Sequence, residues 1–137
     1  MPSKKIVLDT NCLLVSISKY GEAYPVWRGF LDGRYTLCVS TEILEEYEEI
    51  IASMATPDVA RNVVDAILKR RNVERIDPYY HWNLITADPD DNKFVDCAFA
   101  SQADFIVTDD GHFAEAAKSP FPLFRVMGLD AFAEMMK

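Results

Sequence analysis

Residues 6–9 of the chain read Ile-Val-Leu-Asp, and residues 105–110 read Phe-Ile-Val-Thr-Asp-Asp. Each stretch begins with a continuous apolar run and ends in acidic residues. Apolar runs without polar alternation are typical of central parallel strands, which are buried on both faces of a sheet. Because ligands bind beyond the carboxyl ends of such strands, Asp9, Asp109 and Asp110 are the first candidates for a functional site.

The rest of the chain alternates between strand and helix patterns. Further strands are predicted at residues 35–39, 73–76 and 124–126. Helical spacing of apolar residues predicts helices at 13–17, 26–31, 41–54, 57–71, 91–103 and 129–136, with a short helix after residue 111. Pro78 and Pro89 mark residues 77–90 as a loop. This order predicts an α/β fold, a three-layer α/β/α sandwich with a mainly parallel central sheet, built as a single domain over residues 1–137.

Two of the predicted helices supply further acidic candidates. On the 41–54 helix, Glu46 and Glu48 lie at the two borders of the apolar stripe, where one of them can reach over the core toward the site. On the helix that starts near residue 91, Asp91 lies on the apolar face and near the positive end of the helix dipole. Asp96 lies about 140° away from it. The Asp91 carboxylate is therefore either a helix cap or a ligand.

Composition favours a folded protein that remains in the cytoplasm. Hydrophobic residues make up 50% of the chain. Three apolar residues between Lys5 and Asp9 are too few for a signal-peptide core, and no window approaches the ~18 apolar residues of a membrane span. The three cysteines are widely spaced and lack a C-x-x-C pair. They are expected to be reduced core residues of a cytosolic protein.

The formal net charge is −8, with 22 acidic residues against 14 lysines and arginines. This balance argues against a nucleic-acid partner, because binding of phosphates usually requires a basic face. The argument weakens if several of the acids bind divalent cations, since bound ions reverse the local charge. His81 and His112 are isolated in the sequence, and neither is assigned a catalytic role.

Taken together, these residues resemble the PIN-domain nucleases, a family that includes the VapC-type toxins of toxin–antitoxin systems. The resemblance spans nearly the whole chain, at residues 8–11, 40–47, 88–98 and 103–110. It implies that the metal-binding catalytic acids are Asp9, Glu46, Asp91 and Asp110, and that Asn11 and Thr108 are the polar residues that accompany them. Asp109 remains an alternative to Asp110, and Asp88 or Asp90 remains an alternative to Asp91.

A cluster of carboxylates requires a counter-ion. Two like charges ~4 Å apart repel by about 4 kcal/mol at an effective dielectric constant of ~20. Oxygen ligands favour Mg²⁺ or Mn²⁺ over zinc, and such ions activate water and neutralise charge on a phosphate. The acids therefore predict Mg²⁺- or Mn²⁺-dependent hydrolysis of phosphodiester bonds, and the resemblance implies that the enzyme is an endoribonuclease. The resemblance implies in addition a toxin that forms a homodimer and pairs with a protein antitoxin.

Two alternatives differ in class from a nuclease. A haloacid-dehalogenase-like phosphatase also begins with a strand and an aspartate, but it needs a second aspartate two residues later, where this chain has Asn11. The stronger alternative is a catalytically inactive PIN-like module that binds nucleic acid or protein. The presence of all four acids argues against this second alternative.

Overall fold

The computed structural model describes residues 4–86, 88–120 and 124–137. The strands are β1 (Lys5–Leu8), β2 (Thr36–Val39), β3 (Val73–Arg75), β4 (Phe105–Val107) and β5 (Val126–Met127). The helices are α1 (Thr10–Ser16), α2 (Tyr24–Leu31), α3 (Thr41–Met54), α4 (Pro57–Lys69), α5 (Asn92–Ser101), α6 (Gly111–Ala116) and α7 (Leu129–Met135), with a 3₁₀ turn η1 (Pro89–Asp91) before α5. The described strands form one parallel sheet in the order β3-β2-β1-β4-β5.

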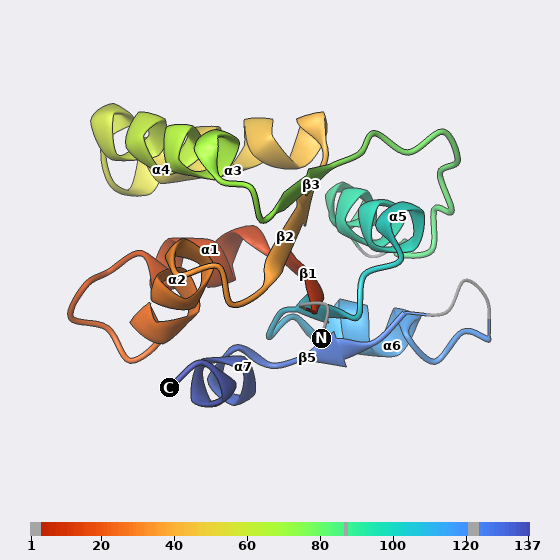
Figure 1. The fold of residues 1–137 in the computed structure, drawn as a ribbon. Coiled ribbons are helices and arrows are strands. Elements are labelled where there is room, and N and C mark those ends of the chain that lie inside the picture. The colour runs from red at the N-terminus through yellow and green to blue at the C-terminus, as the bar shows by residue number, and fades with distance from the viewer. Residues whose placement is uncertain (1–3, 87, 121–123) are drawn as a thin grey trace.

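The order of the strands creates a switch point at the centre of the sheet. The connections from β1 to β2 and from β2 to β3 run toward one edge, whereas the connection from β3 through α5 leads back to β4 on the other side of β1. Since parallel crossovers are right-handed, the helices before and after this reversal cover opposite faces. Figure 1 shows α5 and α6 on one side of the sheet and α1, α2 and α7 on the other. The predicted three-layer sandwich is confirmed.

The register of the central strands aligns the ends of β1 and β4. Ile6 pairs with Phe105, and Leu8 pairs with Val107. The central residues are excluded from solvent, and Val7 and Ile106 are both fully buried. Burial of each such side chain contributes about 1.5–3 kcal/mol. The pairing ends at the same level in both strands, so the residues that follow them, starting with Asp9 and Thr108, lie side by side.

Helix α3 begins and packs as its sequence predicts. The Ser40 hydroxyl accepts a hydrogen bond from the Ile43 amide at 3.2 Å, which caps the helix. Most of its apolar stripe is buried, although Met54 in the last turn is exposed. The Tyr47 hydroxyl donates to the Leu8 carbonyl. This bond ties the middle of α3 to the end of β1, and it thereby sets the position of the neighbouring Glu46.

The loop between β3 and η1 is held by three polar side chains. Asp77 accepts from the Thr41 amide at 2.7 Å, and Asn92 exchanges two hydrogen bonds with the backbone of Ile85. Asp96 accepts from the Trp82 amide at 3.0 Å. Helical geometry puts Asp96 on a different side of α5 from Asp91. Asp96 is nevertheless buried, because this loop covers its side of the helix.

Several element boundaries differ from the predictions. α2 begins at Tyr24 rather than Val26, because Pro25 fits the first turn of a helix. α5 ends at Ser101 rather than Ala103, because Gln102 adopts a left-handed conformation with φ 56°. β5 starts at Val126, two residues later than predicted. Among the described residues, no helix has the length and apolar character needed to cross a membrane.

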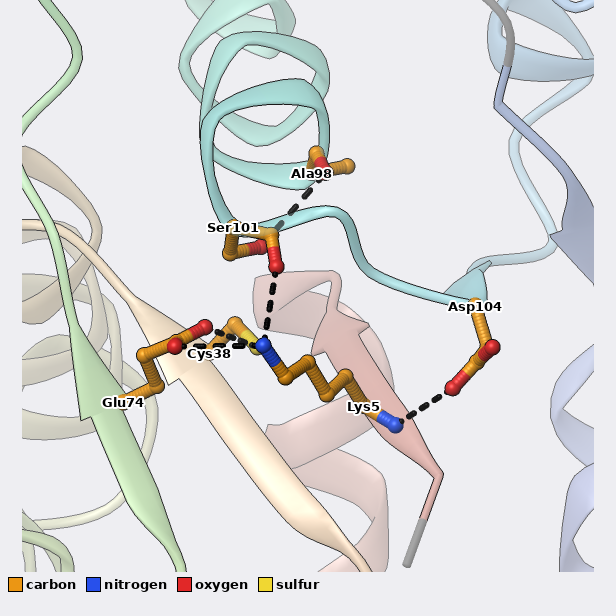
Figure 2. A network of polar contacts seen from close by, with 6 residues as sticks. All are labelled: Lys5, Cys38, Glu74, Ala98, Ser101 and Asp104. Carbon is orange, nitrogen blue, oxygen red and sulfur yellow. Dashed lines mark hydrogen bonds and ion pairs between the residues drawn. The ribbon is translucent and has the colours of Figure 1, made fainter. Parts of the chain in front are cut away.

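A polar network lies near the amino ends of β1 and β4, on the face of the sheet that α5 covers (Figure 2). The Lys5 ammonium contacts Glu74 Oε1 and the Ser101 carbonyl, each at 3.2 Å. The Lys5 amide donates to Asp104 at 2.7 Å. Glu74 also accepts a weak hydrogen bond from the Cys38 thiol. The network ties β1, β3 and the end of α5 together.

Candidate metal centre

Asp9 is the first acidic residue beyond the end of β1. Its amide continues the ladder by donating to the Val107 carbonyl at 3.0 Å. The residue is only 8% exposed, and Thr108 Oγ1 donates to Asp9 Oδ2 at 2.7 Å. Burial raises the pKa of Asp9 above its ordinary value, although the bond from Thr108 acts in the opposite direction. The repulsion of Asp110 adds to the increase.

Thr108 also positions Asp110. Its hydroxyl oxygen accepts from the Asp110 amide at 3.1 Å while the hydroxyl donates to Asp9. Asp110 Oδ1 in turn accepts from the His112 amide at 2.9 Å and caps the short helix α6. A single threonine therefore joins the ends of β1 and β4, which supports the prediction that Thr108 accompanies the acids.

Asp91 reaches the same place from the end of η1. Its Oδ2 atom is buried and has no hydrogen-bond partner within the described part of the chain. Burial, followed by the repulsion of Asp88, Asp110 and Asp9, raises the pKa of Asp91 to about 7. A buried polar atom without a partner is costly. The Asp91 carboxylate is therefore disfavoured in its charged form until a cation lies next to it.

His112 joins this group although its sequence context gave no reason to choose it. Three possible ligand atoms lie within 4.8 Å of one another, one each from Asp91, Asp110 and His112. His112 Nδ1 is 3.4 Å from Asp110 Oδ1. The sequence contains one weak indication for His112. It lies two positions after the strand-end aspartate Asp110, and such a residue falls in the first turn of the next helix.

Glu46 lies beside these acids and is held on both of its oxygens. Thr10 Oγ1 donates to Oε2, and Lys93 Nζ contacts Oε1 at 2.6 Å. The side chains of Lys93 and Glu46 are 15% and 25% exposed. Glu48, the other candidate on α3, is exposed to solvent. The charge of Glu46 is near enough to raise the pKa of Asp9, but Glu46 lies outside the group of ligand atoms formed by Asp91, Asp110 and His112. Glu48 has no such relation to these acids in the described structure.

The alternative acids have local structural contacts. Asp109 Oδ1 accepts from the Leu129 amide at 3.0 Å, at the first turn of α7. Asp88 Oδ1 accepts from the Asp90 amide at 3.2 Å and caps η1, and Asp90 itself is exposed. Asp110 also caps a helix, so the choice rests on position: Asp110, and not Asp109, lies within 4.8 Å of ligand atoms of Asp91 and His112. Asp91 is favoured over its neighbours by its buried oxygen without a partner. Asn11 is exposed and lines a hollow of about 370 Å³ together with the strand-end aspartates.

The donor set fits a hard divalent cation. Asp9, Asp91 and Asp110 offer carboxylate oxygens, which Mg²⁺ and Mn²⁺ prefer, and Mn²⁺ also accepts an imidazole nitrogen such as that of His112. The unpartnered Asp91 oxygen and the raised pKa values of two acids show that the chain does not compensate these charges by itself. A cation bound between the carboxylates would compensate them.

The fold and the acidic group define a doubly wound α/β protein with a candidate metal site at its switch point. The family model of the PIN domain matches residues 5–112. The chain therefore belongs to the PIN domain family.

The comparison with solved structures agrees with this assignment. The fold is similar to that of a chain in the crystal structure of VapBC2 from Rickettsia felis bound to a DNA fragment from their promoter. The two share 20% identity and a TM-score of 0.63, with 90% of this chain and 98% of that chain covered. A search among curated protein sequences found no significant match.

Proposed function

We propose that this PIN domain is a metal-dependent ribonuclease that hydrolyses RNA with Mg²⁺ or Mn²⁺. Asp9, Asp91 and Asp110 would hold the ion, and Glu46 is the fourth acid of the group. The observation that carries the proposal is the buried Asp91 oxygen without a partner, in one group with the Asp110 carboxylate and the His112 imidazole and near enough to Asp9 for its charge to raise the Asp91 pKa. Membership of the PIN domain family supports this proposal and argues against a haloacid-dehalogenase-like phosphatase.

The chain's own residues prepare the site for this reaction. Thr108 fixes the Asp9 carboxylate, and the α6 cap fixes the Asp110 carboxylate. A bound cation would lower the pKa of a water molecule and neutralise charge on the scissile phosphate. Because Asp9 and Asp110 are held by hydroxyl and backbone donors, these two carboxylates need little reorganisation when the ion and the substrate bind.

The similarity to VapBC2 supports a finer proposal about biological role. We propose that the chain is the toxin of a cytoplasmic toxin–antitoxin pair, that it forms a homodimer and that a protein antitoxin binds it. A small reading frame beside the gene, whose product binds the purified chain, would support the pairing. A monomer on sedimentation at micromolar concentration would contradict the homodimer.

The test of the ribonuclease is degradation of a labelled RNA with Mn²⁺ by the purified chain and by two isosteric variants. Asp9→Asn and Asp110→Asn keep an oxygen for the local hydrogen bonds and remove the charge, so both should fold and lose at least about 100-fold in rate. Calorimetry should show Mn²⁺ uptake by the wild type and weaker uptake by both variants.

Two outcomes contradict the proposal. Equal activity of the wild type and both variants would reveal a contaminating nuclease. Absence of both metal uptake and RNA cleavage in a well-folded wild type would leave the non-enzymatic PIN-like module as the better explanation.

A further inference from the structure

A second cavity lies next to the acidic group. It has a volume of about 390 Å³, and its walls come from the start of α3, the loop after β3 and the side of α5 that faces this loop. The side chains that matter here are Thr41, Asp77, His81, Lys93 and Asp96. Lys93 belongs to both places, since it lines this cavity while its ammonium contacts Glu46 at 2.6 Å. A ligand that spans the two sites would pass Lys93.

We propose that this cavity binds the nucleoside next to the cleaved phosphate of a single-stranded RNA. The inference rests on the ribonuclease proposed above and assigns it a specificity site. A volume of 390 Å³ lies within the range of small-ligand sites. A base can enter a cavity only when it is unpaired, which is how proteins usually read the sequence of RNA.

The side of the cavity formed by α5 and the loop is fixed by a buried carboxylate. The Asp96 side chain is 4% exposed, and Asp96 Oδ2 lies 3.1 Å from His81 Nδ1. Its other oxygen accepts from the Trp82 amide. A carboxylate acceptor places the proton on Nδ1, which leaves His81 Nε2 to hydrogen-bond a ligand. This arrangement fixes an imidazole ring where it can distinguish one base from another.

Two exposed aromatic residues follow the cavity residue Pro78 in the loop. Tyr79 is fully exposed and Tyr80 is largely exposed. The Tyr80 and Trp82 rings make an edge contact at 4.6 Å between centroids. Base stacking on such rings contributes about 1–3 kcal/mol per base. A second unpaired base could therefore stack beside the one in the cavity.

Lys93 supplies the charge that a polyanion needs at this edge. The chain carries a net charge of −8, and the acids of the catalytic group increase the local repulsion. An ammonium has three donors, and the contact with Glu46 uses one of them. The phosphate that links the bound nucleoside to the cleavage site would lie close to this ammonium. Glu42, Asp77 and Asp96 make the rest of the lining acidic, so the cavity suits the uncharged base of a nucleoside, while Lys93 faces the phosphate.

The experiment combines abasic RNAs with variants of the cavity. A single-stranded RNA and a set of copies, each with one abasic nucleotide, are bound to the protein in Ca²⁺ and followed by fluorescence anisotropy. Wild type should lose at least about 10-fold in affinity for one abasic position next to the mapped cleavage site. His81→Ala should bind the intact RNA as weakly as the wild type binds that abasic copy, and it should no longer distinguish the two.

Two further variants separate base recognition from loop anchoring and from charge. His81→Asn keeps an amide donor for Asp96, so it should keep the melting temperature of the wild type and still lose the discrimination. Lys93→Met should reduce the slope of log affinity against log salt by about 1 without weakening Mn²⁺ binding. Lys118→Met and Glu49→Gln, exposed on other surfaces, are the matched controls and should change neither value.

The outcomes distinguish the inference from the function on which it rests. An abasic penalty of equal size in wild type and His81→Ala would overturn the cavity assignment even if cleavage is metal-dependent. If His81→Ala bound RNA as the wild type does but lost binding to a protein partner, the cavity would be a protein-binding site and the RNA assignment would be wrong. Cleavage that is insensitive to Asp9→Asn would instead overturn the ribonuclease.

Discussion

The two ends of β1 carry polar groups of opposite character. At the amino end, the Lys5 ammonium contacts Glu74 and the Ser101 carbonyl, and the Lys5 amide contacts Asp104 (Figure 2). At the carboxyl end, Asp9 lies with further acids whose charges repel it. The first group contains its own counter-charge. The second group lacks a counter-charge, which a bound cation would supply.

This difference separates a structural polar group from a functional one. Natural proteins leave few buried polar atoms without partners, so an exception usually has a purpose. The Lys5 group links strands and a helix end, and its pairs need no ligand. The acidic group costs stability, and that cost is understandable where a cation and a phosphate are to be bound. The four predictions that follow test this contrast, starting with the largest expected effect.

Replacement of Asp91 should separate stability from function most clearly. Asp91→Asn removes a ligand, so Mn²⁺ affinity and RNA cleavage should each fall by at least about 100-fold. The metal-free variant should be more stable than the wild type at pH 8, by about 1 kcal/mol or about 4 °C in melting temperature, because a disfavoured charge is removed. Calorimetry and thermal melting measure both effects.

Asp90→Asn provides the matched control, since Asp90 is exposed and adjacent. It should change neither metal affinity nor melting temperature appreciably. If Asp91→Asn kept wild-type metal affinity, or if Asp90→Asn lost it, the assignment of Asp91 to the acidic group would be wrong.

The pH dependence should show the same contrast. Because the pKa of Asp91 is about 7 in the folded chain, a proton competes with the metal below that pH, and the apparent Kd should rise by up to about 10-fold per pH unit. In the metal-free chain, the folded state binds more protons than the unfolded state between pH ~4 and ~7. The free energy of unfolding should therefore decrease as pH rises through this window and level off above it.

Urea unfolding of the metal-free protein at several pH values measures this slope. Asp91→Asn should flatten it, because the carboxyl group whose pKa is raised to about 7 is gone. The raised pKa of Asp9 should leave a smaller slope of the same sign. A stability that rises between pH 4 and 7 in the wild type would contradict the pKa assignment.

Asp109 and Asp110 are adjacent and should respond differently. Asp109→Ala removes the acceptor for the Leu129 amide at the start of α7 and should cost about 1 kcal/mol of stability. Asp109→Asn should retain most of that stability, since asparagine also caps helices. Both variants should cleave RNA within a few-fold of the wild-type rate. A 100-fold loss of cleavage in Asp109→Asn would exchange the roles of the two residues.

The smallest effect is expected at the amino end of β1. Lys5 and Glu74 are 38% and 37% exposed, so solvent screens the pair, and Lys5→Met should cost only about 0.5 kcal/mol. Metal binding and RNA cleavage should be unchanged. Comparison with Lys118→Met, where an exposed pair with Glu115 is lost, would show whether the network adds anything to an ordinary surface ion pair.

Much of the site could be predicted because its central residues follow the strands directly. Two apolar runs and the rule for strand ends predict Asp9, Asp109 and Asp110, and the resemblance favours Asp110 over Asp109. The structure places Asp9 and Asp110 at the switch point, joined through Thr108. Glu46 and Glu48 were equivalent on the helix. The resemblance to the PIN-domain nucleases selects Glu46, and the Tyr47 contact with β1 and the contacts of Glu46 give the physical basis for the difference.

Other members depend on contacts between residues far apart in the chain. Lys93 meets Glu46 across 47 positions, and Asp109 caps a helix that begins 20 positions later. Asp96 is buried by a loop that crosses α5 in space. No local pattern carries these facts, because each requires the relative placement of two elements.

The sequence by itself determined the order of the elements, the parallel sheet and the acids at the strand ends, because burial of apolar runs and helical periodicity act over a few neighbouring residues. Tertiary structure alone decided that Asp91, Asp110 and His112 share one place, that Lys93 stands between the acids and the second cavity, and that Asp96 orients His81. These relations arise from strand register and helix packing, which bring distant residues within a few ångströms of one another.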